Sequence, residues 1–322
     1  MAENTVKKIA TRESYGNSLK ELAEEFPNLV VLDADLAAAT KTGIFRKAYP
    51  DHLRKPPPPR HIDCGIAESN MMGVAAGLSL VGKIPFVSSF AMFAAGRAFE
   101  QVRNSIGYPH LNVKIGATHA GITVGEDGAT HQCNEDIALM RTIPGMVVMC
   151  PSDDVEARAA VRAALEYEGP VYIRFGRAAV PVINDHPGYH FEIGKGTVVR
   201  EGKDVTIVAT GICVDSALGA AKMLEEEGIS AEVVNICTIK PLDEEIIINS
   251  AKKTGKVVTV EEHSVIGGLG SAVCDCLCAN HPVPVKKVGM QDVFGESGSA
   301  AALVEKYGLD AKGVYKSVKE FL

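Results

Sequence analysis

The stretch HIDCGIAESNMMGVAAGLSLVGKIPF, residues 61–86, reads as a strand, a glycine turn, a helix and a second strand. The short apolar run at 61–64 is typical of a strand, and a helical pattern of small and apolar residues covers 68–81. The apolar run that starts at Ile84 predicts the next strand. Because strands that alternate with helices build parallel sheets, this stretch indicates an α/β fold.

The same alternation of apolar runs and helical patterns continues through nearly the whole chain. In the first half it predicts further strands at 29–33, 84–89, 113–119, 145–150 and 170–175, and helices at 11–25, 68–81, 91–106 and after the cap-like segment 151–154. In the second half it predicts strands at 204–210, 231–236, 256–261 and 283–288, and helices at 213–227, 243–252, 268–279 and the C-terminus. The strands are almost continuously apolar, which is expected of strands covered on both faces.

A change of composition divides the chain into two predicted domains with mostly parallel sheets. The segment AAVPVINDHPGYHFEIGKG, residues 178–196, lacks periodicity and contains two prolines and several glycines. We therefore predict one domain at 5–177, a linker at 178–192 and a second domain at 193–322. The segment KPPPPR, 55–60, is interpreted as a stiff surface loop, with a docking motif for a proline-binding domain as the alternative.

The composition excludes several classes of partner. The chain has 322 residues, a net charge of −7, 46% hydrophobic residues and no tryptophan, which argues against nucleic acid or anionic membranes as partners. No apolar run reaches the length of about 18 residues that spans a bilayer, and the N-terminus lacks the apolar stretch of a signal peptide. We expect a cytoplasmic protein. The eight cysteines, including the CDCLC run at 274–278, are interpreted as free thiols and not as a metal site.

Ionisable residues concentrate in three predicted loop segments, 33–40, 64–70 and 117–136. Loops of parallel sheets commonly carry the functional site. Glu68 stands out because no lysine or arginine follows it until Lys83, and a carboxylate in apolar surroundings either stays protonated or has a specific partner. The glycine-rich third segment is interpreted as a ligand-binding loop, with a solvated surface loop and a metal site as the alternatives.

Three motifs in this chain resemble transketolase, a thiamine-diphosphate enzyme. They are CGIAESNMMGVAAGLSL at 64–80, SSFAMF at 88–93 and GEDGATHQCNEDIALMRTIPGM at 125–146. The resemblance covers the middle and C-terminal portions of that enzyme and extends from about Lys8 to the C-terminus. It implies a pyrimidine-binding domain followed by a transketolase C-terminal domain.

The resemblance implies roles for residues on the cofactor side. Glu68 corresponds to the glutamate that hydrogen-bonds N1′ of the aminopyrimidine and so promotes loss of the thiazolium C2 proton. Phe90 and Phe93 match the aromatic residues that flank the aminopyrimidine, whereas the family's third aromatic position is Gly96 here. Asp35 matches a cofactor-side residue. The family's serine four residues later is Ala39 in this chain, with the neighbouring Thr40 as a possible substitute.

The resemblance also implies a set of substrate-binding residues. His119 and His131 match histidines that line the channel to the thiazolium, and His131 is counted as catalytic because it lies nearer the reacting hydroxyls. Asp127 resembles the acid that binds the C2 hydroxyl of the donor. Arg177 and Arg12 resemble the arginines that bind the sugar phosphate, a role that suits guanidinium groups. Arg12 could equally be a solvated N-terminal arginine.

One part of the family's active site has no counterpart in this sequence. Thiamine-diphosphate enzymes hold the diphosphate and a divalent metal through a Gly-Asp-Gly motif. The nearest match here is GEDG at 125–128, which lies in the substrate loop. The resemblance therefore implies a partner chain, the N-terminal transketolase subunit, that carries Gly-Asp-Gly and binds Mg²⁺ or Ca²⁺ in an α2β2 heterotetramer. His263 is interpreted as structural.

The favoured function is that of the C-terminal subunit of a two-chain transketolase, which moves a two-carbon ketol unit between sugar phosphates. The β subunit of a 2-oxo acid dehydrogenase is the first alternative, but it would not need the residues His119, Asp127 and Arg177. A 1-deoxyxylulose-5-phosphate synthase is the second, but it normally has arginine at the position of Phe93. A non-catalytic regulatory relative is the third.

Overall fold

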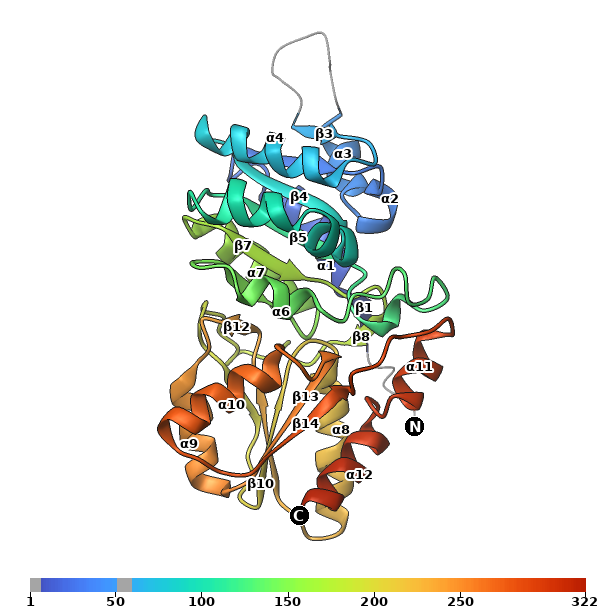
Figure 1. Ribbon diagram of the computed structural model, residues 1–322, viewed down its shortest axis with the longest axis vertical. Helices are drawn as coiled ribbons and strands as arrows, with labels where there is room; N and C mark the ends of the chain where they lie inside the picture. The colour runs from blue at the N-terminus through green and yellow to red at the C-terminus, as the bar shows by residue number, and fades with distance from the viewer. Residues whose placement is uncertain (1–6, 51–59) are drawn as a thin grey trace.

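The computed structural model describes residues 7–50 and 60–322 and has two α/β units, with the N-terminal half above and the C-terminal half below in the view of Figure 1. The predicted surface loop KPPPPR lies outside the described residues apart from Arg60. None of the helices within the described residues is long and apolar enough to cross a membrane.

The first unit is built on a seven-stranded sheet with the order β12-β6-β7-β5-β4-β2-β3. Its strands are β2 (Leu29–Asp33), β3 (His61–Asp63), β4 (Ile84–Phe90), β5 (Lys114–Thr118), β6 (Val147–Met149), β7 (Val171–Arg174) and β12 (Thr238–Lys240). All neighbours are parallel except β12 and β6. Phe90 pairs with Thr118 and Asp33 pairs with Ser88. The carboxyl ends of these strands therefore meet at one edge, where sites on parallel sheets usually lie.

The helices of the first unit include the predicted ones at 11–25, 68–81 and after 151–154 and three that the sequence did not predict, and they differ from the prediction in the segment 91–106. The helices are α1 (Thr11–Leu22), α2 (Ala37–Thr40), α3 (Gly43–Ala48), α4 (Glu68–Leu80), α5 (Phe99–Gln101), α6 (Asp136–Arg141) and α7 (Asp154–Glu166), with a 3₁₀ turn η3 (Ile122–Val124). The three that the sequence did not predict are α2, α3 and α6. The predicted single helix at 91–106 is instead two π-helical segments, η1 (Met92–Arg97) and η2 (Val102–Gly107), on either side of α5. Such π segments are rare and occur frequently at functional sites.

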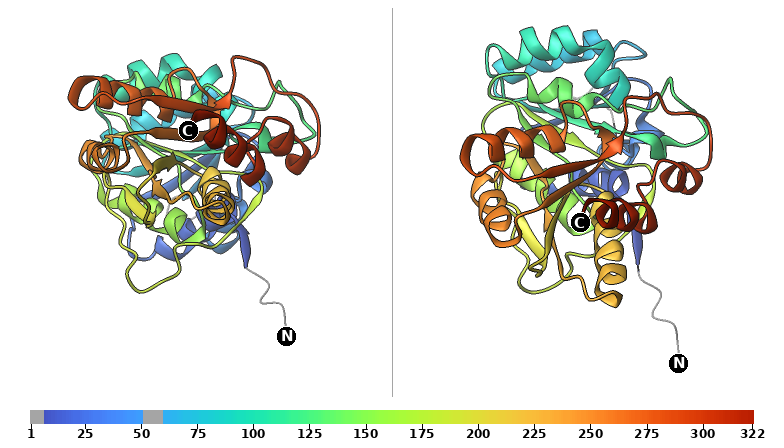
Figure 2. Two further views of the ribbon diagram at one scale, coloured as in Figure 1. Left: turned by 90° about the horizontal axis from the view of Figure 1, so that it is seen from below. Right: turned by 60° about the horizontal axis from the view of Figure 1, so that its bottom comes forward.

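The second unit is built on a five-stranded sheet with the order β14-β13-β10-β11-β9. Its strands are β9 (Thr197–Arg200), β10 (Val205–Ala209), β11 (Ala231–Asn235), β13 (Val257–Ser264) and β14 (Val285–Met290), and its helices are α8 (Cys213–Glu226), α9 (Glu244–Thr254), α10 (Leu269–Asn280), α11 (Ala300–Lys306) and α12 (Ala311–Phe321). β9 is antiparallel and the other pairs are parallel. The predicted C-terminal helix is two helices, of which α12 packs against α8 (Figure 2). The predicted fold class, α/β with two mostly parallel sheets, is confirmed.

Two short strands lie outside the predicted first domain but pair with strands inside it. β12 comes from the predicted second domain but pairs antiparallel with β6, where Thr238 lies opposite Met149. β1 (Lys8–Ala10) pairs antiparallel with β8 (Ala179–Pro181), which lies inside the predicted linker. The segment 178–192 is therefore partly a strand, and one strand of the second half completes the first sheet. The predicted domain boundaries stay a prediction.

A buried ion network joins the two units. Arg174, at the end of β7, is 5% exposed and its Nε donates to Asp136 at 3.0 Å. The same guanidinium donates to the carbonyl oxygen of Glu262 on β13 at 2.7 Å and lies 3.7 Å from its carboxylate. Burial alone would lower the pKa of Arg174, but the neighbouring carboxylates outweigh burial and raise it. Because these ions are desolvated, they are stable only while they remain paired.

Candidate active site

Glu68 is the first residue of α4 and its side chain is 1% exposed. Its Oε2 accepts a hydrogen bond from Nη1 of Arg97 at 2.9 Å, and its Oε1 lies 3.4 Å from the hydroxyl of Ser89. Of the two alternatives that the sequence left for Glu68, a protonated carboxyl or a specific partner, the structure shows a specific partner, Arg97. Sequence reasoning missed Arg97 because it is 29 residues away and reaches Glu68 only through the fold.

Phe93 is linked to this carboxylate through Arg97, and Phe90 is stacked with Phe93. Phe90 ends β4 and Phe93 lies on η1, and their rings are nearly parallel, with centroids 5.8 Å apart and an interplanar angle of 15°. The Arg97 guanidinium stacks over the Phe93 ring at 4.6 Å. At Gly96 an added Cβ would meet the terminal methyl of Met92 at 2.4 Å, so this position offers no third ring. The wall of the pocket is thus made of two rings and one guanidinium.

His119 follows β5 and stacks on Phe90, with ring centroids 3.9 Å apart. Nη1 of Arg12 lies 3.1 Å from Nε2 of His119 and also donates to the carbonyl oxygen of Ala39 at 3.0 Å. Because a guanidinium only donates, Nε2 must accept, so the proton of the neutral ring is assigned to Nδ1, 2.9 Å from the hydroxyl of Thr118. Burial and the nearby positive charges of Arg12 and Arg177 lower the pKa of His119 to about 3.

We expect His119→Asn to weaken the acid sensitivity of folding. In the unfolded chain His119 takes up a proton as the pH falls through its ordinary pKa of 6.5, whereas in the folded chain it resists protonation until about pH 3. The stabilisation that the neutral His119 gives the folded chain is therefore complete above pH 6.5, and it is lost progressively as the pH falls from 6.5 toward 3. The loss of melting temperature between about pH 7 and 5 should be smaller in the variant, while a matched change at the exposed His186 should leave the wild-type slope. Equal slopes in the wild type and His119→Asn would contradict the assignment.

His131 faces the two phenylalanine rings with its edge. Its centroid lies 5.4 Å from that of Phe93 and 6.3 Å from that of Phe90. Its Nδ1 lies 3.0 Å from the hydroxyl of Thr130. Asp127 is exposed on the same loop, and the contacts of the described residues do not join it to His131. The structure therefore brings the two histidines to the aromatic pair but leaves Asp127 at the surface.

Arg177 joins Arg12 and His119 in a cationic cluster. Its Nη1 donates to the carbonyl oxygen of Val124 and lies 3.0 Å from the carboxylate of Glu126. Burial, followed by the charge of Arg177, lowers the pKa of Arg12, which indicates that the two guanidiniums are close neighbours. We call Arg12, His119 and Arg177 the phosphate clamp, after the role that the resemblance implies for the two arginines.

The residues at the start of α2 are engaged in local hydrogen bonds. Asp35 has a left-handed backbone (φ 60°), and its N–H donates to Oδ1 of Asp63 at 3.1 Å. The hydroxyl of Thr40 is buried and donates to Oδ2 of Asp33 at 3.0 Å. Thr40 therefore does not offer a free hydroxyl in place of the one missing at Ala39, which corrects the expectation from sequence.

The C-terminal unit holds the loop that carries His131. The backbone N–H of Thr123 donates to Oε1 of Glu262 at 2.7 Å, and Nε2 of Gln132 donates to the carbonyl oxygen of Glu296 at 2.8 Å. At Gly121, where φ is 74°, an added Cβ would lie 2.4 Å from Oε1 of Glu262. Sequence reasoning used the glycine but missed these anchors, because they are side chains far away in the chain.

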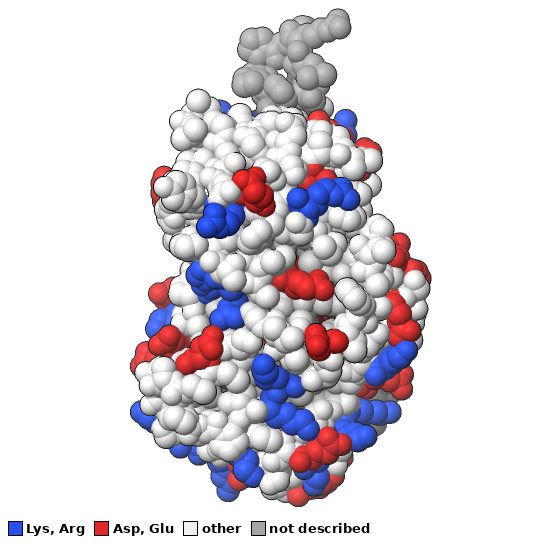
Figure 3. All heavy atoms as spheres, in the orientation of Figure 1, with Lys and Arg blue, Asp and Glu red and all other residues white. Residues whose placement is uncertain are grey.

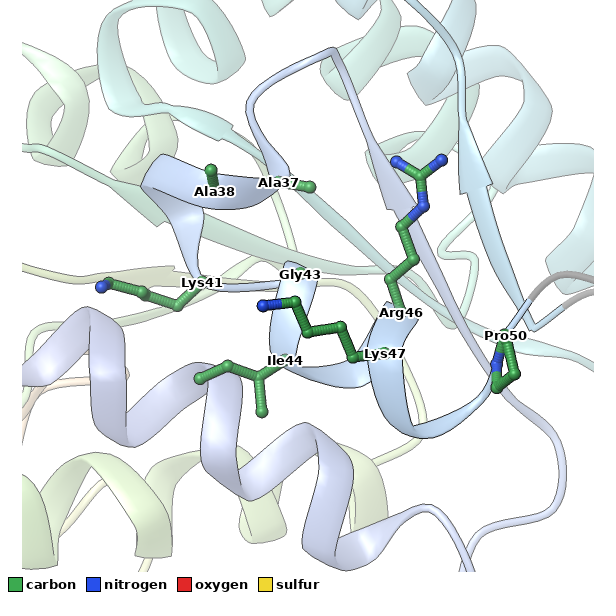
Figure 4. Close-up of a pocket in the computed structure, with 8 residues that line it drawn as sticks. All are labelled: Ala37, Ala38, Lys41, Gly43, Ile44, Arg46, Lys47 and Pro50. Atoms are coloured by element: carbon green, nitrogen blue, oxygen red, sulfur yellow. The ribbon is translucent and has the colours of Figure 1, made fainter.

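A cavity of about 700 Å³ lies between α2 and α3, close to the phosphate clamp (Figure 4). It is lined by Ala37, Ala38, Lys41, Gly43, Ile44, Arg46, Lys47 and Pro50. Lys41 and Lys47 extend to the same side in Figure 4, and Lys41 pairs with Glu13 at 3.1 Å. Lys41 adds to the positive charges that lower the pKa of His119, although burial is the main cause.

Within 7–50 and 60–322, no cluster of three or more His, Cys, Asp or Glu could hold a metal ion.

Comparison with protein families accounts for almost the whole chain. The family described as "Transketolase, pyrimidine binding domain" matches residues 7–182. The family described as "Transketolase, C-terminal domain" matches residues 194–314.

Individual proteins match over nearly their full length. The chain is 48% identical to the 6-deoxy-6-sulfo-D-fructose transketolase subunit SqwH of Clostridium sp. (strain MSTE9), over 96% of this chain and 93% of that relative. It is 39% identical to a subunit of the apulose-4-phosphate transketolase of Phocaeicola vulgatus, over 98% of each protein. A solved structure described as "Split gene transketolase, inactive beta4 tetramer" is 57% identical, with a TM-score of 0.87 and 98% of each protein covered.

Proposed function

Because the chain belongs to the transketolase family, as the subunit with the pyrimidine-binding and C-terminal domains, we propose that it forms half of a two-chain transketolase. In this proposal the enzyme transfers a two-carbon ketol unit between sugar phosphates, as in the pentose phosphate pathway. The observation that carries the proposal is a buried carboxylate, Glu68, whose partner Arg97 stacks on Phe93, one of two nearly parallel rings that contact His119 and His131.

The residues fit the aminopyrimidine ring of thiamine diphosphate. Phe90 and Phe93 offer flat faces for stacking, and the Glu68 carboxyl would bind a ring nitrogen of the aminopyrimidine. When bound, the cofactor supplies the nucleophilic carbon that carries the two-carbon unit. Glu68 would hold a proton shared with the ring nitrogen, and Asp35 would lie on the cofactor side.

The loop from 117 to 136 would bind the sugar. His131 would contact and orient the reacting hydroxyls, because its ring faces the aromatic pair. Asp127 would bind the C2 hydroxyl of the donor, from its exposed place on the same loop. The phosphate clamp would bind the terminal phosphate through the guanidiniums of Arg12 and Arg177, with a neutral His119 between them.

Arg177→Met is expected to raise KM for a phosphorylated donor by roughly 10- to 100-fold, because a hydrogen bond to a charged group contributes about 1.5–3 kcal/mol. The kcat should change little, and an unphosphorylated ketose should show no comparable loss. Steady-state kinetics of the assembled enzyme measures both. Lys47→Met, a cation of the neighbouring cavity, is the matched control. An equal loss for both donors would show that Arg177 does not bind the phosphate.

A partner subunit would supply the diphosphate and metal site. The sequence contains no Gly-Asp-Gly, and two relatives are themselves transketolase subunits. The surface over α4, the helix that begins with Glu68, carries few charged side chains (Figure 3). Its Leu80 is 73% exposed, and Val81, just after the helix, is 72% exposed. These features support an N-terminal subunit with bound Mg²⁺ or Ca²⁺ docked in an α2β2 heterotetramer, and a chain that is inactive alone, as the 57% identical tetramer is described.

A tagged pull-down that isolates the partner subunit, followed by reconstitution of the complex, tests the function. Turnover of xylulose 5-phosphate with ribose 5-phosphate would support a standard transketolase. Turnover of pyruvate with a lipoyl domain would instead identify a 2-oxo acid dehydrogenase. Since the relatives act on a sulfosugar and on apulose 4-phosphate, both belong among the donors tested.

A further inference from the structure

Arg97 contacts the two groups that the proposed function assigns to the cofactor ring, the carboxylate of Glu68 and the face of Phe93. Its guanidinium donates to Oε2 of Glu68 at 2.9 Å and stacks over the face of Phe93 at 4.6 Å. A guanidinium is flat and carries hydrogen-bond donors along its edge, so it satisfies a buried carboxylate and a ring face at the same time. A bound aminopyrimidine would need that same carboxylate and that same kind of ring contact.

The two partners of Glu68 make opposite demands on its proton. A carboxylate paired with a guanidinium stays ionised and only accepts hydrogen bonds. A buried carboxyl without a cation favours its neutral form, which can donate a hydrogen bond to a ring nitrogen. Ser89 is the other side chain that contacts the Glu68 carboxylate, and its hydroxyl carries no charge. Arg97 is therefore the charged group among the contacts of Glu68 within the described residues.

The position of Arg97 permits it to leave Glu68. It is the last residue of the π-helical segment η1, and its side chain is 51% exposed although its carboxylate partner is buried. Water can therefore solvate the guanidinium as soon as it moves away. Glu68 has no such freedom, since it lies at the buried start of α4.

We propose that Arg97 is a positioning residue that holds Glu68 in the unloaded chain and is displaced from it when the aminopyrimidine ring of thiamine diphosphate binds. The inference rests on the proposed function. Displacement transfers Glu68 from an ion pair to a hydrogen bond with the ring nitrogen, and one proton is taken up from solvent in the exchange. Arg97 thereby lowers the affinity for the cofactor and protects the empty site from an uncompensated buried charge.

Arg97→Met in the complex with the partner subunit tests the exchange. Titration calorimetry with thiamine diphosphate and the metal should give a Kd about tenfold lower than wild type, because no ion pair has to be broken before the ring binds. Titrations in two buffers of different ionisation enthalpy should show that the wild type takes up about one proton more than the variant. Arg103→Met, an exposed arginine on η2, is the matched control and should behave as wild type.

The outcomes separate the inference from the function. A wild-type complex that does not bind thiamine diphosphate would overturn both. If the wild type binds but Arg97→Met binds equally or more weakly, with the same proton uptake, Arg97 is not displaced and the inference alone is wrong. Glu68→Gln checks that Glu68 is the group that takes up the proton. With Glu68→Gln present, proton uptake should be the same with Arg97 and with Arg97→Met, because residue 68 can no longer ionise.

Discussion

Glu68→Gln is expected to reduce kcat of the reconstituted enzyme by about 10²- to 10⁴-fold, the usual contribution of a positioned acid–base group. Glutamine keeps the size and the hydrogen-bonding capacity of the side chain but cannot hold or release a proton. Since Glu68 is 1% exposed, no solvent group replaces it easily. Turnover of the donor and acceptor sugars, together with the cofactor occupancy of each preparation, measures the effect.

A matched control separates the role of Glu68 from a general loss of fold. Glu100 lies on α5, and its side-chain hydrogen bonds within the described residues are with Gln101 and Asn104, so Glu100→Gln should retain full turnover. Wild-type turnover in Glu68→Gln with a normally occupied site would remove Glu68 from the mechanism. Loss of both occupancy and turnover would instead assign Glu68 to binding.

Arg174→Met is expected to lower the free energy of unfolding by about 3–5 kcal/mol, the typical effect of removing one partner from a buried ion network. The change leaves Asp136 and Glu262 buried without their shared cation. These carboxylates belong to different units, so the joint between the units should weaken first. Urea unfolding followed by circular dichroism measures the loss.

The comparison with a surface arginine makes this second result specific. Arg158 on α7 pairs with Glu21 and Asp154 but is 34% exposed, and exposed pairs contribute about 0–1 kcal/mol. Arg158→Met should therefore unfold close to wild type. Similar losses in the two variants would show that the interface network does not stabilise the fold.

Most of the fold was predictable from sequence because the strands of a covered parallel sheet carry a strong local signal. The runs at 29–33 and 205–209 are apolar and entirely buried, as their composition predicts. The strand Thr238–Lys240 has no such signal, because it is three residues long and pairs with a strand about 90 positions earlier. The β1–β8 pair was hidden for the same reason: each strand is three residues long.

The candidate site was predictable to the extent that it lies at the carboxyl edge of one sheet. Phe90 and His119 follow adjacent strands, and the register of β4 and β5 brings them into contact. Arg97 was not predicted because its contact with Glu68 depends on the fold. The four-residue spacing from Phe93 does suggest that the two side chains share a face, and this was the available signal for their stacking.

The strand Thr238–Lys240 also limits how this chain can be divided or recombined. A fragment that stops before residue 193 would leave the backbone of β6 open, and open strand edges recruit strands from other molecules. In a hybrid whose N-terminal half comes from one relative and whose C-terminal half comes from another, the strand at Val147–Met149 would have to pair with a strand at 238–240 from the other protein. The two halves are therefore best engineered together, as one unit that keeps the β12–β6 pair.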